Sequence, residues 1–477
     1  MNHRAKNYFS HQWQNGSGNI GISHDPATWQ PVAEYSCATT AEFETGVSAA
    51  RHAFDCGTWP HQPRLRAEIL YEFAELLQAR SREIEPVLVQ LNGKLIKEAR
   101  GEIGAAISEL KYYAGLARNL WGRVAEIDSG CYSLIAREGA GVVGIIVPWN
   151  APVTLLIRSL APALAAGCTV VLKVAHQTSL VHQMVLECLT DISSLPQDIV
   201  CSFVEDGADI SKRMCEHPLI DVISFTGSSQ TGKKIAASSS GTLKRLSLEL
   251  GGKAPVVVFA DADLAAAAEA IAIAGYFNAG QDCTAATRVI VQDSVYDEFV
   301  ALLTEQAKAV AIGAPADEDV FLGPVNNVNQ LARVSDLLSR VPSHAQVMTG
   351  GSALDRPGFF FPATVVAGLR QDDELIQKEI FGPVITVQKF SDEAQAVSMA
   401  NGVDYGLASS VWTANHGTAM RMAKAFDFGC VWINTHIPLV AEMPHGGFKR
   451  SGYGKDLSGY GFEDYTRIKH VMTNLGA

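Results

Sequence analysis

The sequence predicts an α/β fold built on parallel, doubly wound sheets. Short β-branched runs alternate with helical stretches over residues 141–259, and the same alternation returns over residues 254–429. The strand runs are apolar throughout, which is typical of strands buried on both faces between layers of helices. A chain of 477 residues has room for about two or three packed units of this kind.

Each alternating region supplies its own set of predicted elements. In the first, strands are expected at 142–147, 169–173, 199–204 and 220–225, and helices at 153–166, 180–189, 210–216 and 231–238. In the second, strands are expected at 254–259, 289–291, 384–390 and 409–412, and helices at 263–277 and 295–310. These regions therefore predict two α/β sheets in succession.

The part of the chain before residue 140 is expected to be mainly helical. Residues 64–81 and 83–91 place apolar side chains at helical spacing, which predicts two amphipathic helices. Residues 123–137 are strand-like with no helix after them, so they are expected to form a hairpin that projects from the body. An unpaired ribbon of this kind usually needs a partner to cover its edges.

Composition and charge exclude several classes of protein. With 38 basic and 50 acidic residues the net charge is −12, which argues against a nucleic-acid-binding surface. No Cys-x-x-Cys pair occurs among the nine cysteines, so neither a metal site nor a disulfide framework is expected. The first residues lack the apolar segment of a secretory signal, and no long apolar run spans a membrane. A cytoplasmic protein with a small-molecule ligand is expected.

Two glycine-rich segments resemble phosphate-binding loops without meeting their structural rules. Residues 139–144 match G-x-G-x-x-G but precede a strand, so a simple glycine turn is expected. Residues 227–234 lie between a strand and a helix, but Lys234 occupies the position where a P-loop needs a hydroxyl for Mg²⁺. A P-loop-like phosphate-binding enzyme is therefore a weak alternative, although this helix start can still face a pyrophosphate.

Three residues are candidates for catalysis. Cys283 follows Gly280 at a break in the apolar pattern and is a candidate nucleophile, which needs a base or a positive field to form the thiolate. Glu249 lies between leucines, where burial would raise its pKa toward that of a general base; an ion pair with Lys253 or Lys244 is the alternative. Asn150, at a strand end, would donate to an oxyanion or simply form a turn.

Together these segments resemble the aldehyde dehydrogenase superfamily over about residues 25–472. The matching pieces are Pro148-Trp149-Asn150, Lys173, Phe225-Thr226-Gly227-Ser228, Glu249-Leu250-Gly251-Gly252-Lys253, Gly280-Gln281-Asp282-Cys283, Glu379-Ile380-Phe381-Gly382-Pro383 and Pro444-His445-Gly446-Gly447-Phe448-Lys449. The resemblance implies a Rossmann-type cofactor domain at residues 1–120 and 140–251, and an α/β catalytic domain at 252–450. It also implies a small β oligomerisation arm formed by 121–139 and the tail 451–477, in a homodimer or homotetramer.

The same resemblance implies roles for individual residues. Cys283 would attack the aldehyde, Asn150 and the Cys283 backbone N–H would hold the oxyanion, and Glu249 would activate the hydrolytic water. Lys173 and Glu379 would hold the two riboses of the cofactor. The cofactor-binding set would be Ile146, Val147, Trp149, Lys173, Ala175, His176, Phe225, Thr226, Gly227, Ser228, Thr231, Leu250, Gly251, Glu379 and Phe381.

One departure from the family pattern concerns cofactor choice. Many NAD-specific members carry a glutamate three residues after the lysine, where this chain has His176. A neutral imidazole hydrogen-bonds a ribose but does not repel a 2′-phosphate as a carboxylate does. NAD with appreciable use of NADP is therefore expected.

Signals for the substrate point in two directions. Residues 278–288 and 434–447 are similar to the aminobutyraldehyde dehydrogenase branch, whereas Ala151 and Arg158 are similar to salicylaldehyde and vanillin dehydrogenases. Arg158 would stack on an aromatic ring, bind a distal carboxylate or phenolate, or pair with Asp282 or another acid. The expected tunnel residues are Tyr113, Leu116, Ala151, Leu155, Arg158, Phe277, Asp282, Thr284, Ile437 and Leu439.

An aromatic or amine-derived aldehyde, such as one like 4-aminobutanal, is the expected substrate. A semialdehyde with a distal carboxylate held by Arg158 remains the alternative. A catalytically silent binding protein is a third possibility, which the joint presence of Cys283, Glu249 and Asn150 argues against.

Overall fold

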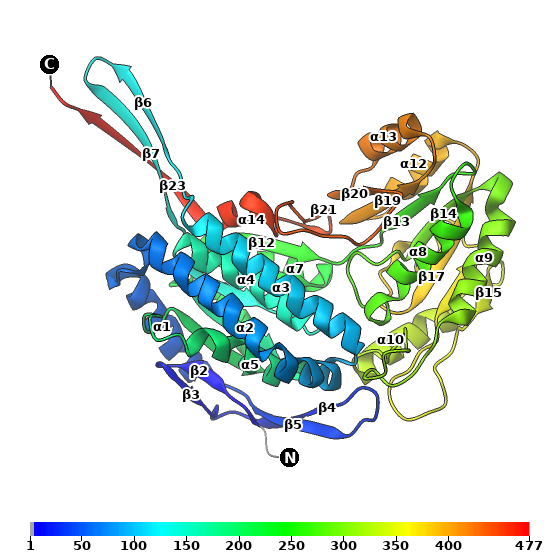
Figure 1. Cartoon of the computed structure of the whole chain (residues 1–477), viewed down its shortest axis with the longest axis horizontal. Helices are drawn as coiled ribbons and strands as arrows, with labels where there is room; N and C mark the ends of the chain where they lie inside the picture. Colours follow the sequence, from blue (N-terminus) through cyan, green and yellow to red (C-terminus); the bar gives the residue numbers. More distant parts are fainter. Residues whose placement is uncertain (1–3, 477) are drawn as a thin grey trace.

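The computed structural model describes residues 4–476. Two large sheets, each covered by helices, form the body, and a three-stranded arm projects from it (Figure 1). The expected α/β fold with parallel strands is confirmed. Within residues 4–476 no helix combines the length and the apolar character needed to cross a bilayer.

The first sheet has eight strands in the order β22-β12-β11-β8-β9-β10-β2-β3. Its parallel strands are β8 (Val142–Ile146), β9 (Thr169–Ala175), β10 (Val200–Glu205), β11 (Val222–Gly227) and β12 (Arg245–Leu250). Antiparallel edge strands are β2 (Asn7–Phe9), β3 (Gln12–Gln14) and β22 (Gly452–Tyr453). Every residue of β8 is buried, as its continuous apolar run predicts.

Helices cover both faces of this sheet. One apolar core includes side chains of α1 (Thr40–Cys56), α6 (Asp209–Glu216) and α7 (Ser229–Ser239). The other includes α2 (Pro63–Asn92), α3 (Ile96–Ala117), α4 (Pro152–Ala166) and α5 (Ser179–Thr190). Figure 1 shows α2 and α3 as long neighbouring helices on the outside of the second group. The carboxyl ends of the parallel strands stay open between these layers.

The second sheet has seven strands in the order β15-β16-β17-β14-β13-β19-β20. Its strands are β13 (Pro255–Val258), β14 (Arg288–Gln292), β15 (Gln346–Thr349), β16 (Thr364–Ala367), β17 (Val384–Phe390), β19 (Ala408–Trp412) and β20 (Cys430–Ile433). Helices α8 (Leu264–Tyr276) and α9 (Tyr296–Ala309) pack on one face, and α12 (Glu393–Asn401) and α13 (His416–Ala425) on the other. Helices α10 (Val328–Ser339) and α11 (Glu374–Gln377) lie in a neighbouring apolar cluster.

The projecting arm joins two distant parts of the chain. Strand β7 (Cys131–Gly139) pairs with β6 (Arg123–Asp128) on one side and with β23 (Thr466–Asn474) on the other. Helix α14 (Ser458–Asp464) leads into β23. The short strands β18 (Tyr405–Gly406) and β21 (Phe448–Lys449) form a separate antiparallel pair. Residue 452 of the tail also pairs with β12, so the tail completes the first sheet as well as the arm.

The region before residue 140 differs from the sequence expectation in two ways. Residues 64–91 were expected to form two helices, but they belong to the single helix α2, which continues through Pro86. Residues 4–36 form strands in addition to the expected helices: β1 (Arg4–Ala5), β2, β3, β4 (Ile20–His24) and β5 (Pro31–Ser36). These strands are short and lie at sheet edges or in a small separate sheet, so they carry little apolar pattern.

The glycine turn expected at residues 139–144 has a specific physical reason. Gly141 has φ +137°, and a Cβ there would lie 1.8 Å from Oδ2 of Asp221. The same Asp221 oxygen accepts a hydrogen bond from the Val142 backbone N–H at 2.8 Å. Glycine therefore lets the Asp221 carboxylate reach the start of β8, a structural role without any phosphate.

Candidate active site

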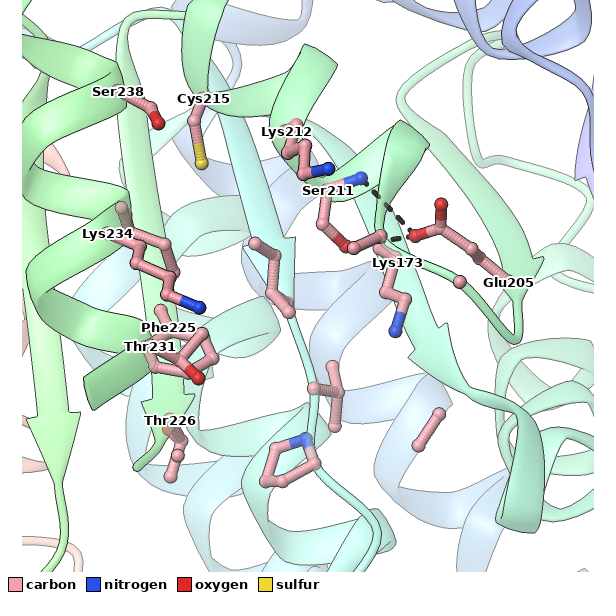
Figure 2. A pocket seen from close by; sticks show the side chains of 18 of the residues that line it. Lys173, Glu205, Ser211, Lys212, Cys215, Phe225, Thr226, Thr231, Lys234 and Ser238 are labelled. Carbon is pink, nitrogen blue, oxygen red and sulfur yellow. Dashed lines mark hydrogen bonds between the residues drawn. The ribbon is translucent and has the colours of Figure 1, made fainter. Parts of the chain in front are cut away.

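A cavity of about 710 Å³ lies at the carboxyl ends of the first sheet, between the strands and α6 and α7 (Figure 2). Open α/β sheets bind their ligands at this edge. Ten of the residues expected to hold the cofactor line it: Ile146, Val147, Trp149, Lys173, Ala175, His176, Phe225, Thr226, Gly227 and Thr231. The structure therefore brings these ten residues together around one cavity.

Charged groups gather at one end of this cavity. Burial lowers the pKa of Lys173, and burial together with the Lys173 charge lowers the pKa of His176, so the imidazole is neutral. Glu205 was not predicted; its carboxylate accepts from the Ile210 N–H at 2.7 Å and the Ser211 hydroxyl at 3.0 Å, at the start of α6 (Figure 2). Its position at the end of β10 is the signal that would have identified it.

A second cavity of about 210 Å³ continues from the first and contains the three catalytic candidates, Asn150, Glu249 and Cys283. The remaining expected cofactor residues line it: Ser228, Leu250, Gly251, Glu379 and Phe381. Glu379 accepts from the Gly252 N–H at 3.0 Å, and a Cβ on Gly251 would lie 2.3 Å from a Glu379 oxygen. Gly251 therefore leaves room for that carboxylate.

Cys283 lies where the second cavity meets a third, because its side chain lines both. The residue is partly exposed, as its position after Gly280 predicts. Burial among protein atoms raises the pKa of the thiol well above its ordinary value, and the carboxylates of Asp282, Glu379 and Glu249 raise it further. The positive charge of Arg158 acts in the opposite direction.

Glu249 is buried, and neither of its carboxylate oxygens has a hydrogen-bond partner among residues 4–476. The expected alternative, an ion pair with Lys253 or Lys244, is not formed. Lys244 donates to the Ile220 carbonyl at 2.7 Å, and burial lowers the pKa of Lys253 to about 7. Burial, and then the charge of Asp456, raise the pKa of Glu249 well above its ordinary value. These are properties of a general base.

Asn150 directs its side chain toward the loop that carries the thiol. Its amide Nδ2 donates to the Gln281 carbonyl at 3.1 Å, two residues before Cys283. Because Asn150 lines the same cavities as Cys283, its N–H₂ lies beside the space where a carbonyl oxygen would sit. The simple alternative of a turn asparagine does not account for this contact across the site.

The third cavity, of about 420 Å³, leads away from Cys283 and Asn150 on the side opposite the cofactor cavity. Eight of the expected tunnel residues line it: Ala151, Leu155, Arg158, Phe277, Asp282, Thr284, Ile437 and Leu439. Tyr113 and Leu116 do not line it. Both pack into the core around α2, α3 and α4, which leaves the Tyr113 ring fully buried behind the tunnel wall.

The charged residues of this tunnel have partners within the protein. Arg158 pairs with an acid, as one of the alternatives expected, and that acid is Glu109 rather than Asp282: the Arg158 Nε and Nη2 donate to one Glu109 oxygen at 3.2 and 2.9 Å. Asp282 instead accepts from the Thr284 N–H at 2.7 Å and the Thr284 hydroxyl at 2.6 Å. Glu109 was not predicted, because no local pattern indicates which acid on α3 faces α4.

The aldehyde dehydrogenase family model matches residues 13–471 of the chain. The chain belongs to the aldehyde dehydrogenase family. Betaine aldehyde dehydrogenase of Bacillus subtilis is 35% identical over 457 residues, covering 94% of this chain and 93% of that protein. Human retinal dehydrogenase 2 is 35% identical over 478 residues, covering 99% and 92%.

Solved structures of aldehyde dehydrogenases superpose over nearly the whole chain. Betaine aldehyde dehydrogenase from Staphylococcus aureus in complex with NAD⁺ has a TM-score of 0.96 and 31% identity, covering 99% of this chain and 95% of that one. The NAD-dependent aldehyde dehydrogenase from Sinorhizobium meliloti has a TM-score of 0.97 and 34% identity, with the same coverage. This aldehyde dehydrogenase is thus an NAD(P)-dependent oxidoreductase that oxidises aldehydes.

Family membership disfavours the phosphate-binding alternative. In this aldehyde dehydrogenase residues 227–229 open α7, with the Ser228 hydroxyl accepting from the Thr231 N–H at 3.2 Å. Among residues 4–476 no cluster of three or more His, Cys, Asp or Glu side chains is arranged to hold a metal ion. Gly227 of this loop lines the first cavity and Ser228 lines the second.

Proposed function

We propose that the chain oxidises its aldehyde to a carboxylic acid through a covalent bond to Cys283. The observation that carries this proposal is the position of Cys283: its sulfur lies between the dinucleotide cavity and the tunnel, with Asn150 and Glu249 around it. A nucleophile at that junction reaches a carbonyl carbon from the tunnel and a hydride acceptor from the cofactor side.

The first stage forms the sulfur–carbon bond. The Cys283 thiolate attacks the carbonyl carbon, and the negative charge moves to the oxygen, which accepts from the Asn150 side chain and the Cys283 backbone N–H. A bound nicotinamide supplies the hydride acceptor. Collapse of the oxyanion expels the hydride from the same carbon and leaves a thioester on Cys283.

The second stage releases the acid. Glu249 takes a proton from a water molecule, whose oxygen attacks the thioester carbon. The carbon–sulfur bond breaks and the carboxylic acid leaves. Glu249 releases its proton to solvent, which restores both the Glu249 carboxylate and the Cys283 thiolate. The unpartnered oxygens of Glu249 support this role, because a carboxylate already held in an ion pair would be a poorer base.

For the substrate we propose an aromatic or amine-derived aldehyde of medium size. The tunnel of about 420 Å³ is mainly apolar in its lining, and two relatives are named for betaine aldehyde and retinal. Arg158 uses two nitrogens on Glu109 and keeps Nη1 for a substrate oxygen. Because Glu109 neutralises the guanidinium, a neutral hydroxyl or carbonyl is favoured over the distal carboxylate of a semialdehyde.

The proposal is tested with Cys283→Ser and Glu249→Gln, using Cys56→Ser at an exposed thiol as control. Cys283→Ser is expected to abolish acid production. Glu249→Gln is expected to keep a burst of NADH equal to one turnover and to slow the steps after it by about 10²-fold or more. Undiminished acid production by Cys283→Ser would refute the mechanism.

A substrate panel tests the tunnel proposal. We expect Arg158→Ala to lower kcat/KM for hydroxybenzaldehydes by about tenfold while sparing hexanal, because only the former offer an oxygen to Nη1. Turnover of 4-aminobutanal and succinate semialdehyde completes the comparison. An equal loss for every aldehyde would contradict a substrate role for Arg158.

We also propose the division into domains and the assembly that the arm suggests. Residues 1–120 and 140–251 would form the cofactor domain, 252–450 the catalytic domain, and 121–139 with 451–477 the oligomerisation arm. The arm's exposed apolar residues, among them Val124 and Ile468 at 67% and 65% exposure, support a homodimer or homotetramer. A cytoplasmic location stays a prediction.

A further inference from the structure

Two glutamates on α3, Glu98 and Glu102, lie one turn apart. Both are buried, and both line the third cavity together with Asn150 and Cys283. Residues four apart lie on one face of a helix, about 6 Å from each other. A buried carboxylate is retained only where donors satisfy it. Each of these two finds its donors in a different catalytic segment.

Glu98 holds the segment that carries the thiol. Its Oε1 accepts from the backbone N–H of Asn278 at 2.7 Å, and its Oε2 accepts from Leu95 at the start of α3 at 2.8 Å. Asn278 and Ala279 have φ values of 50° and 55°, a left-handed conformation that costs free energy for residues other than glycine. The loop from Asn278 to Cys283 therefore begins in a strained turn that Glu98 fixes.

Glu102 holds the segment that carries the oxyanion donor. Its Oε1 accepts from the backbone N–H groups of Val153 and Thr154 at 2.7 and 3.3 Å, which are otherwise unpaired donors in the first turn of α4. Its Oε2 bonds the Lys94 ammonium, which also donates to the Asn150 carbonyl at 3.2 Å. The turn at Asn150 is thereby tied to α3.

The two segments also bond each other directly. The Asn278 side chain donates to the Asn150 carbonyl at 2.9 Å, and the Asn150 side chain donates to the Gln281 carbonyl at 3.1 Å. These contacts hold the two loops against each other. Helix α2 also contacts the loop that carries Asn150, because the Asn92 side chain donates to the Trp149 carbonyl at 2.6 Å. The bonds to Glu98 and Glu102 attach both loops to one helix, α3.

We propose that Glu98 and Glu102 are positioning residues that set the separation between the Asn150 amide and the Cys283 sulfur. This inference rests on the proposed function, since it assumes that these two groups act on the carbonyl. Helix α3 supports both loops, so the distance between its two carboxylates sets the distance between the two loops. A displacement of about 1 Å at either loop is enough to lower turnover by about 10²-fold.

The experiment compares Glu98→Gln with Glu102→Gln. An amide offers one oxygen and one N–H₂, so each variant turns one accepted hydrogen bond into a donor–donor contact. Turnover is measured with KM for aldehyde and for NAD, beside the rate at which iodoacetamide alkylates Cys283. Alkylation is a displacement at carbon that develops no oxyanion, so it depends on the thiol but not on Asn150.

The two variants are expected to differ in a way that a general loss of rigidity in the protein would not produce. Glu102→Gln should lower kcat by about 10- to 100-fold and change KM for NAD and the alkylation rate by less than about twofold. Glu98→Gln should lower both kcat and the alkylation rate. The shorter acids, Glu98→Asp and Glu102→Asp, keep the buried charge and should show the same two patterns more weakly. These variants test the inference if the Gln variants fold poorly.

Asp221→Asn serves as the matched control. Asp221 also accepts a strand N–H, from Val142 at 2.8 Å, and binds Arg51, but at the amino end of β8, away from the catalytic residues. It is expected to lower Tm while leaving kcat unchanged. Turnover within twofold of wild type in all four glutamate variants would overturn the inference, as would equal changes in alkylation for both positions. If Cys283→Ser is inactive while the glutamate variants stay active, the proposed function stands and only the positioning role is refuted.

Discussion

At the scale of single residues, burial shapes the chemistry of both the nucleophile and the base. It raises the pKa of the Cys283 thiol and of the Glu249 carboxyl, so both groups hold their protons to higher pH than they would in water. Asp456 beside them has a pKa of about 7, again raised first by burial. The reactive forms of thiol and carboxyl are therefore both favoured by alkaline conditions.

A pH dependence follows from the sign of these shifts. Because the pKa of Glu249 is raised, the carboxyl is protonated and inactive as a base up to a higher pH than an ordinary carboxyl, and thioester hydrolysis should accelerate as pH rises beyond the usual carboxyl range. Single-turnover release of acid after the NADH burst measures this step. In Glu249→Gln this acceleration should be lost. Only the increase in rate that comes from hydroxide attacking the thioester should remain. A pH-independent wild-type rate would contradict the assignment.

Motif spacing was enough to predict the catalytic candidates, but not their partners. Cys283, Glu249 and Asn150 meet in one cavity although they come from three separate segments. The pairing of Arg158 with Glu109 joins two helices, and a single sequence carries no sign of which acid faces which base across such a contact. The same holds for Glu205, which neighbours Lys173 only because β9 and β10 pair.

At the scale of elements, the central strands of the two sheets were the most predictable parts, because their residues are buried on both faces and give continuous apolar runs such as β8. Edge strands with exposed residues, such as β3 and β15, were not predicted. Helix α3 was not predicted because Glu98, Glu102 and Glu109 occupy its buried face and interrupt the apolar period. The residues that hide this helix from pattern analysis are the ones that contact the catalytic loops and Arg158.

We expect the ends of β9 and β10 to govern the choice between NAD and NADP. His176 is neutral because burial lowers its pKa, so it presents no charge that repels a 2′-phosphate, and Lys173 adds a cation nearby. We expect wild-type enzyme to use NADP appreciably and His176→Glu to lower kcat/KM for NADP by about tenfold or more while sparing NAD. His176→Gln, which adds no charge, is the control. Equal rejection of NADP by all three proteins would show that Glu205 already supplies the repulsion.

At the scale of the whole molecule, the arm has the exposed apolar surface that is typical of a subunit interface. Strand β6 is exposed at every residue, and both outer strands of the arm present apolar side chains to solvent: Val124 and Ile127 on β6, and Ile468 and Met472 on β23. A flat, apolar edge of this kind is stable in water only when another chain covers it. A second copy of the chain is the partner that symmetry most simply provides.

Charged substitutions in the arm should separate the subunits. We expect Ile468→Glu combined with Met472→Glu to shift the protein from an oligomer toward a monomer in light scattering coupled to size-exclusion chromatography. Glu126→Gln, an exposed change in the same arm, is the control. A mass unchanged by the double substitution, or a wild-type monomer, would contradict assembly through the arm.

The segment 446–453, which lies beside Glu249 and β12, has a consequence for biosynthesis. Ser451 bonds the Gly251 carbonyl from 200 residues further along the chain, β22 pairs with β12, and Gly446 lies so near that a Cβ on it would be 2.6 Å from a Glu249 oxygen. Ribosomes add about 5–20 residues each second. A nascent chain therefore spends about 10–40 s with β12 made and its outer edge bare, which makes that edge a natural place for a chaperone to bind.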